Sequence, residues 1–306
     1  MNNYVALTVG VICAGIGGEL FVRGVVGIAH WARVSAGIIG ATVAAFATSS
    51  PELSVAIGSA LAKKPEISLG DALGSNVVNI ALVLAIPVLI SGIKSAPDSV
   101  RREFPVALFA PMLTAVLALD GVLSRVDGII LLCVFLVWLT SVTLEARRQR
   151  SAAEKVLGEQ RGWLALILCI VGMLFLVGAG HFIVTGAKGV ALAFGIHEFI
   201  IGATIVAIGT SVPELATTIM ANIRKHDEVG LGTILGSNIY NGLFIISVAA
   251  IIYPIKIVLH ETMTVLVFGL ISMMLVFPLR DGVIRRWRGL LLLGLYAAYV
   301  FMVLDK

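Results

Sequence analysis

Two stretches of this 306-residue sequence decide its fold, GIIGATVAAFATSSPEL at residues 37–53 and FIIGATIVAIGTSVPEL at residues 199–215. They align without a gap at an offset of 162 residues, and DALGSNVVN at 71–79 and TILGSNIYN at 233–241 keep that offset. About half of the aligned positions from Ile38 to Asn79 are identical, which is more than two unrelated apolar segments would share. Self-similarity at a fixed offset is the sequence signature of a duplicated structural unit. The chain is therefore predicted to consist of two related halves.

The composition around these repeats excludes an ordinary soluble protein. Apolar residues make up 59% of the chain and charged residues only 13%, which is too little charge to cover a water-facing surface. The net charge of +4 comes from Lys and Arg scattered between apolar runs, so no basic domain for nucleic acid is indicated. The three cysteines lie singly in apolar runs, a pattern typical of packing residues rather than of a metal or disulfide site.

The apolar runs predict an all-α polytopic membrane protein, because a membrane-spanning helix needs about 20 such residues. A charged linker, residues 146–161, separates a first five-helix repeat, residues 1–145, from a second, residues 162–306. The ten predicted helices lie near residues 4–22, 34–62, 69–93, 104–119, 126–145, 162–186, 197–222, 229–253, 260–279 and 287–304.

The odd number of helices in each half sets the orientation of the second half. After five crossings the chain re-enters the membrane from the opposite side, so the two repeats are predicted to be inverted about an axis in the membrane plane. Folds of this kind place substrate sites at the repeat interface near the bilayer midplane. A duplicated bundle without transport activity is the alternative.

The distribution of positive charge predicts the topology. With the N-terminus outside, 16 of the 22 Lys and Arg residues fall in cytoplasmic connections and six fall outside. Because cytoplasmic connections carry the excess of positive charge, the N- and C-termini are expected outside the cell membrane.

Each repeat centres on a Thr-Ser-x-Pro-Glu element, which contains Thr48, Ser49 and Glu52 in the first half. The second half repeats it as Thr210, Ser211 and Glu214. A charged side chain inside a membrane helix costs about 2.5 to 3.5 kcal/mol on insertion scales. No Lys or Arg lies in the same helix cores, so the expected counter-charge is a bound cation.

The proline of each element is expected to free backbone carbonyls near Ala45 and Ala207, because proline lacks an N–H and clashes with the preceding turn. Carboxylates, hydroxyls and free carbonyls together form the all-oxygen environment that hard cations such as Ca²⁺ and Na⁺ require. A helix kink whose hydroxyls satisfy the backbone is the simpler explanation of Thr/Ser-Pro alone. The repeated glutamate favours a functional site.

The second element, Gly-Ser-Asn-x-x-Asn, presents oxygens on one helix face because Ser and the second Asn are four residues apart. Packing between helices is the alternative role for such small polar residues. Asn76 and Asn238 point elsewhere and are expected to brace the helix, and Asp71 is expected to cap the helix that follows it. The candidate ligands from this element are Ser75, Asn79, Ser237 and Asn241.

ATSSPE with GSNVVN, and GTSVPE with GSNIYN, resemble the two alpha repeats of the sodium/calcium exchanger family, within the calcium/cation antiporter superfamily. The resemblance covers nearly the whole chain, and the short linker is similar to that of the prokaryotic members. It implies a prokaryotic cytoplasmic membrane protein that is not an enzyme and needs no cofactor, with Ca²⁺ and Na⁺ as substrates, functioning as a monomer.

The resemblance also implies roles for individual residues. Glu52 and Glu214 would bridge the central Ca²⁺ with help from Thr48 and Thr210. Asn79 and Asn241 would hold the central water or cation position, and the gating helices would be the first and sixth. The Na⁺ sites would use Ser49, Ser211, Ser75, Ser237 and the carbonyls of Ala45 and Ala207.

One departure from the family pattern concerns Asn241, where many members carry Asp. Two carboxylates still balance one Ca²⁺, but ion selectivity and the use of protons are left open. The expected function is exchange of Na⁺ for Ca²⁺, in which cations exclude one another because two carboxylates in a low dielectric disfavour each other's ionised form. The alternatives are H⁺-coupled antiport of Ca²⁺ or another divalent cation, a cation channel, and an intramembrane hydrolase. The last lacks partner residues in the helix cores.

Overall fold

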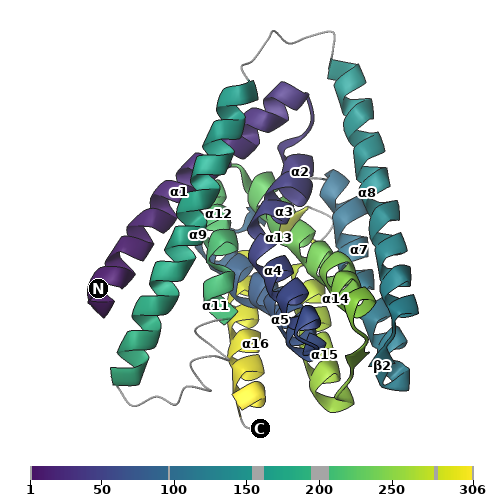
Figure 1. Cartoon of the computed structure of the whole chain (residues 1–306). Helices are drawn as coiled ribbons and strands as arrows, with labels where there is room; N and C mark the ends of the chain where they lie inside the picture. Colours follow the sequence, from purple (N-terminus) through teal and green to yellow (C-terminus); the bar gives the residue numbers. More distant parts are fainter. Residues whose placement is uncertain (1, 96, 154–161, 194–206, 279–281, 305–306) are drawn as a thin grey trace.

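The computed structural model describes residues 2–95, 97–153, 162–193, 207–278 and 282–304. Helices form nearly all of this chain (Figure 1). In chain order they are α1 (Asn3–Ala32), α2 (Ala36–Ile39), the π-helix η1 (Gly40–Ala44), α3 (Ala45–Thr48), α4 (Ser50–Leu61), α5 (Pro65–Val78), the π-helix η2 (Asn79–Leu84), α6 (Ala85–Ser91), α7 (Pro97–Leu117), the 3₁₀-helix η3 (Ala118–Asp120), α8 (Arg125–Ala153), α9 (Gly162–Ala193), α11 (Ala207–Thr210), α12 (Val212–Ile223), α13 (Asp227–Ile239), the π-helix η5 (Tyr240–Ile245), α14 (Ile246–Ile252), α15 (Leu259–Val276) and α16 (Arg286–Leu304).

The protein is a multi-pass membrane protein. Within the described residues, eight helical segments are long and apolar enough to cross a membrane, and the bent pair Ala36–Thr48 and Ser50–Leu61 brings the number to nine. These segments coincide with nine of the ten expected spans. The other expected span, 197–222, begins outside the described residues, which include only its later part, α11 and α12. The count of ten therefore stays a prediction.

Several helices begin or end away from the boundaries that the apolar runs suggested. Helix α8 continues to Ala153 instead of ending near residue 145, because the charged residues after the apolar run are good helix formers. Helix α5 begins at Pro65, a residue well suited to the first turn. Asp71 therefore lies inside α5, and the expectation that it caps the helix is wrong.

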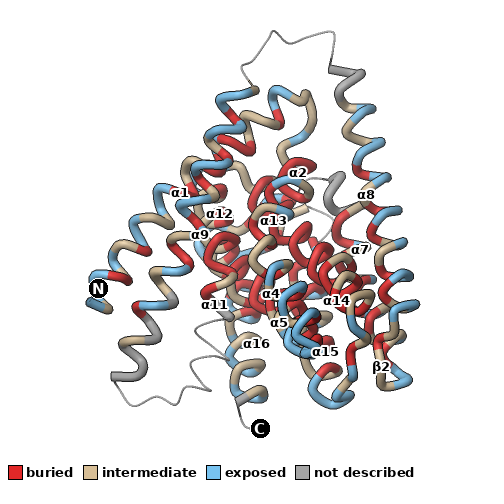
Figure 2. The backbone as a smooth tube through the Cα atoms, in the orientation of Figure 1, coloured by how far each residue is buried: buried red, intermediate tan, exposed pale blue. Residues whose placement is uncertain are grey.

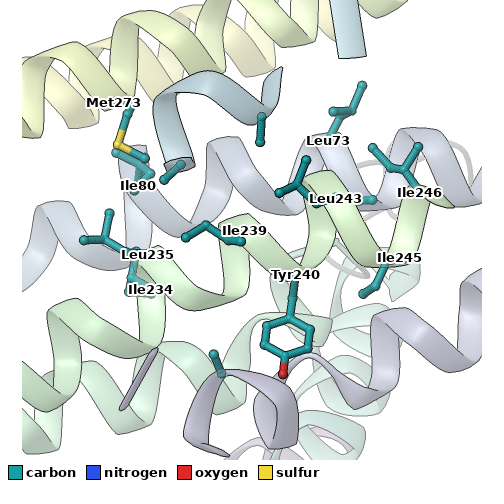
Figure 3. Close-up of a cluster of buried hydrophobic side chains, with 14 of the residues drawn as sticks. Leu73, Ile80, Ile234, Leu235, Ile239, Tyr240, Leu243, Ile245, Ile246 and Met273 are labelled. Atoms are coloured by element: carbon teal, nitrogen blue, oxygen red, sulfur yellow. The ribbon is translucent and has the colours of Figure 1, made fainter. Parts of the chain in front are cut away.

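The centre of the protein is formed by the helices that carry the Gly-Ser-Asn elements. The apolar windows of Pro65–Ser91 and Asp227–Ile252 are 72% and 83% buried, against 33% or less for α1, α8, α9, α15 and α16. Buried residues accordingly concentrate along α5 and α13 in Figure 2. Side chains such as Leu73, Ile80 and Ile239 interlock there (Figure 3). This packing fixes the two elements against each other.

Two short antiparallel strand pairs join the halves at the ends of helices. Strand β1 (Ile93–Lys94) pairs with β4 (Val283–Ile284), and β2 (Val122–Leu123) pairs with β3 (Ile255–Lys256). Strands β1 and β3 are 162 residues apart, and β2 and β4 are one residue short of that offset. Each pair thus joins a strand of one half to a strand of the other.

Helices α1 and α9 form a closely packed pair beside the central helices (Figure 1). A Cβ on Gly24 would lie 2.5 Å from the backbone nitrogen of Cys169, and a Cβ on Gly172 would lie 2.5 Å from that of Phe21. Glycines allow this approach, as is common between membrane helices. Glu19 of α1 also accepts a hydrogen bond of 2.7 Å from Nε of Arg224, the C-cap of α12.

Helix α13 crosses α2 and η1 through a second close backbone contact. A Cβ on Gly236 would lie 2.3 Å from the carbonyl oxygen of Ala41 and 2.7 Å from Cβ of Ala45. Real Cβ atoms do not come so close to a backbone oxygen, so only glycine fits. The contact holds the first repeat's broken helix against the centre of the second repeat.

Substitution of Gly236 tests this contact. We expect Gly236→Ala to lower the melting temperature of the purified protein in detergent, since overpacking of this kind costs about 1 to 3 kcal/mol. Gly294→Ala is the control, because a Cβ on Gly294 of α16 meets no described atom within 4 Å. Equal melting temperatures for the two variants would contradict the packing described here.

Candidate cation site

The Thr-Ser-x-Pro-Glu elements interrupt their helices in the same way in both halves. Ser49 has φ −86° and ψ 8°, and Ser211 has φ −86° and ψ 7°. The proline that follows lies in the first turn of α4 or α12, where its missing N–H leaves no helix bond unmade. In the first half the two parts of the helix are bent by 46°.

Each glutamate lies in the first turn of the helix that begins after the break. Glu52 and Glu214 are both 1% exposed. A helix N-terminus carries a partial positive charge, which stabilises a nearby carboxylate by about 0.3 to 1 kcal/mol. The interruption thus exposes main-chain dipoles to the buried acid without supplying a full counter-charge.

The two elements meet in the middle of the protein. The carboxyl groups of Glu52 and Glu214 are close enough to interact electrostatically. Thr48 of the first half is joined to Glu214 through Ser237. The hydroxyls of Thr48 and Ser237 are 3.4 Å apart, and Ser237 Oγ donates to Glu214 Oε1 at 3.4 Å. Residues of both halves therefore form one cluster.

The Gly-Ser-Asn elements are joined by reciprocal hydrogen bonds. Asn76 Nδ2 donates to the carbonyl of Asn238 at 3.2 Å, and Asn238 Nδ2 donates to the carbonyl of Asn76 at 3.1 Å. Asn79 Nδ2 donates to Asn238 Oδ1 at 3.1 Å. The asparagines expected to brace single helices thus connect the two halves, and their shared offset was the signal that could have indicated it.

Both helices widen into π-helix directly at the second asparagine. Segment η2 begins at Asn79 and η5 at Tyr240, one residue before Asn241. π-helical turns are uncommon and occur frequently at functional sites. Their occurrence at equivalent places in both halves positions the Asn79 and Asn241 amides in the protein centre, where each is 1% exposed.

Many polar atoms of this cluster have no hydrogen-bond partner among the described atoms. Leaving a buried polar atom unpaired costs about 1 to 3 kcal/mol, and more when the group is charged. A hard cation surrounded by oxygens would satisfy them together. The unpaired oxygens are Ser49 Oγ, Ser211 Oγ, Glu52 Oε2, Glu214 Oε2, Asn79 Oδ1 and Asn241 Oδ1.

The remaining expected ligands are placed as follows. Thr48 is fully buried, Ser75 is 3% exposed and Ser237 is fully buried. Thr210 is partly buried at the end of α11, and Ala207 begins that helix.

The expected release of the Ala45 carbonyl is wrong. This oxygen accepts the N–H of Ser49 at 2.9 Å and the Thr48 hydroxyl at 3.3 Å. The carbonyl four residues before Pro51 belongs to Ala47, and it accepts the Ser50 hydroxyl at 2.6 Å. The break at Ser49 therefore keeps these carbonyls bonded.

The charge of the cluster is modest. Among the described residues, no group of three or more His, Cys, Asp or Glu side chains is arranged to hold one metal ion. The cluster contains two carboxylates, and its other oxygens belong to neutral hydroxyl and amide groups. Such a site suits ions that bind and leave rather than a permanently bound metal.

Comparison with known proteins identifies the family of this chain. The family model described as sodium/calcium exchanger protein matches residues 2–144 and 164–304. The sodium/calcium exchanger MaX1 of Methanosarcina acetivorans is 26% identical over 350 aligned positions, covering 98% of each chain. The inner membrane protein YrbG of Escherichia coli is 35% identical over 232 aligned residues, which cover 71% of this chain and 70% of YrbG.

A solved structure supports the same relationship. The sodium-calcium exchanger NCX_Mj, soaked with Na⁺ and Sr²⁺, superposes with a TM-score of 0.84 at 30% identity, covering 97% of each chain. Family model, relatives and structure all cover both halves of the chain. The protein therefore belongs to the sodium/calcium exchanger family of cation antiporters.

Proposed function

We propose that this antiporter exchanges Na⁺ for Ca²⁺ by alternating access at the cluster formed by the two Thr-Ser-x-Pro-Glu elements. The observation that carries the proposal is the pair of buried glutamates, one from each half, whose Oε2 atoms have no hydrogen-bond partner among the described residues. An unneutralised pair of carboxylates inside a membrane protein is expensive. Bound cations from either substrate provide the neutralisation.

The coupling between the two ions follows from this charge requirement. One Ca²⁺ balances Glu52 and Glu214, and Na⁺ ions in the same cluster do the same. Because both ions need the same oxygens, occupancy by one excludes the other. Exchange is then favoured over passage of a single ion, since an empty site carries the full electrostatic penalty.

The proposal includes two inverted five-helix repeats. The start of α1 and the end of α16 lie in the lower half of the view in Figure 1, whereas the end of α8 and the start of α9 lie at the upper end. That arrangement is what an odd number of crossings per half requires. The reciprocal hydrogen bonds of Asn76 and Asn238, and the matching breaks at Ser49 and Ser211, further support a two-fold relation. The termini are proposed to face the outside of a prokaryotic cytoplasmic membrane.

Alternating access is proposed to involve movement of α1 and α9 against the central helices. Glycines give this pair a smooth contact surface, and both helices also pack on α12. The bonds between Glu19 and Arg224 hold α1 to the end of α12 in this conformation. A monomer is sufficient for this mechanism, because the cluster is formed within one chain.

The glutamates provide the direct test. We expect Glu52→Gln and Glu214→Gln each to lower Na⁺-dependent ⁴⁵Ca²⁺ flux in reconstituted vesicles at least about tenfold, because Ca²⁺ affinity depends on the number of charged ligands. Glu66→Gln is the control, since Glu66 is exposed in the first turn of α5. Full activity in both site variants would remove the cluster from the mechanism.

Proton coupling is the second candidate, because protons bound by the two buried carboxylates of Glu52 and Glu214 would neutralise the pair and discharge Ca²⁺ as Na⁺ would. In Na⁺-loaded vesicles, Ca²⁺ uptake should collapse when the Na⁺ gradient is removed at constant pH. Uptake that follows an imposed pH gradient without Na⁺ would instead identify an H⁺ antiporter. Tracer Ca²⁺ flux that persists with no exchange ion on either side would indicate a channel.

A further inference from the structure

A third acidic residue, Asp71, lies inside a membrane-spanning segment and has no role in the cluster described above. It lies in α5, within the apolar span Pro65–Ser91, and is partly buried. None of the ion pairs within the described residues includes it. Acidic residues at such depth are rare and mark ion pathways.

The spacing along α5 places Asp71 on the face that carries the cluster. Asp71, Ser75 and Asn79 follow one another at intervals of four residues, which puts them on one side of the helix. Asp71 therefore lies about 6 Å along the helix from Ser75. Ser75 and Asn79 are 3% and 1% exposed, whereas Asp71 is more exposed than either.

The contacts of the second half indicate which residue lies beside this part of α5. Ser237 contacts Glu214 at 3.4 Å, and the equivalent residues in the first half are Ser75 and Glu52. Helices α4 and α5 pack together as an antiparallel hairpin. Asp71 is one turn closer to the hairpin connection than Ser75, and so lies on the connection side of Glu52. Glu52 Oε2 has no partner among the described atoms.

The two halves differ at this position. The residue 162 positions after Asp71 is Thr233, which is fully buried and donates its hydroxyl to the Val229 carbonyl at 2.8 Å. The second half thus has a satisfied neutral group where the first has a carboxylate with no ion pair among the described residues. The negative charge extends from the cluster in one direction only, toward the connection that contains Lys63 and Lys64.

We infer that Asp71 and the unpaired Glu52 oxygen form an additional cation position, on the outer side of the central cluster, that receives Ca²⁺ entering from outside. The inference rests on the proposed function and on the topology that places residues 63 and 64 outside. Its ligands would be the carboxylates of Asp71 and Glu52, and it is distinct from the central position because Asp71 lies one helical turn further toward the outer connection than Ser75.

A carboxylate on the approach to a site raises the local concentration of cations and their rate of entry. Loss of Asp71 should therefore affect capture of Ca²⁺ from one side of the membrane. Loss of Glu52, by contrast, should affect transport from both sides. This difference in sidedness separates a residue on the outer pathway from a ligand of the central ion.

Asp71→Asn in oriented vesicles tests the inference. We expect the apparent KM for Ca²⁺ presented at the outer face to rise about tenfold, with little change in maximal rate or in the KM at the cytoplasmic face. Asp71→Glu should restore most of the affinity. Asp120→Asn is the matched control, because Asp120 is exposed in a connection also expected outside.

Three results would overturn the inference. They are an outer KM for Ca²⁺ equal to that of the wild-type protein, equal changes of KM at both faces, or a loss of Ca²⁺ affinity in Asp71→Asn that Asp71→Glu does not reverse.

Melting temperatures of all variants establish that the protein is folded. If the wild-type protein shows no Na⁺-dependent flux, the proposed exchange fails instead. Calorimetric titration of Ca²⁺ into detergent-purified wild-type and Asp71→Asn protein then still tests whether Asp71 contributes to cation binding.

Discussion

Two carboxylates buried in the interior of a membrane protein carry a large electrostatic cost, and no ion pair in the described part of the chain neutralises them. Glu52 and Glu214 are both buried, and each has one oxygen with no hydrogen-bond partner among the described atoms. A structure that served stability alone would pair or remove these charges. Their presence at equivalent places in both halves is what the proposed binding of a positively charged substrate would require.

The backbone is adapted to that requirement by local departures from the α-helix. The breaks at Ser49 and Ser211 begin new helices whose N-termini face the acids, and the prolines stabilise the first turns of those helices. The π-helical turns at Asn79 and Tyr240 occur in the most buried part of the chain. There, lipid does not reach the irregular backbone, so the departures are tolerated.

The two halves are similar in backbone and different in charge. Reciprocal bonds between Asn76 and Asn238 hold the central helices in a nearly symmetric arrangement. Asp71 and Thr233 break that symmetry on one side of the cluster, and Glu19 bonds to Arg224 in a contact formed between the halves. A transporter that works across a membrane faces different solutions on its two sides, and differences of this kind allow the two approaches to have different affinities.

Apolar runs and the 162-residue repeat can be found without knowing any tertiary contact, and they were enough to predict the multi-pass class, nine of the described spans, the burial of both glutamates and the family. The sequence by itself could not determine which side chains meet. Helical periodicity gives the face on which Ser237 or Asn238 lies, but not the partner on another helix. Only the tertiary structure paired Asn76 with Asn238 and left the Ala45 carbonyl bonded to Ser49. It also extended α5 back to Pro65, which moved Asp71 from the expected start of the helix into its interior. Those outcomes depend on how helices distant in sequence pack, where close glycine contacts and buried hydrogen bonds select one arrangement among several that the same pattern of apolar residues permits.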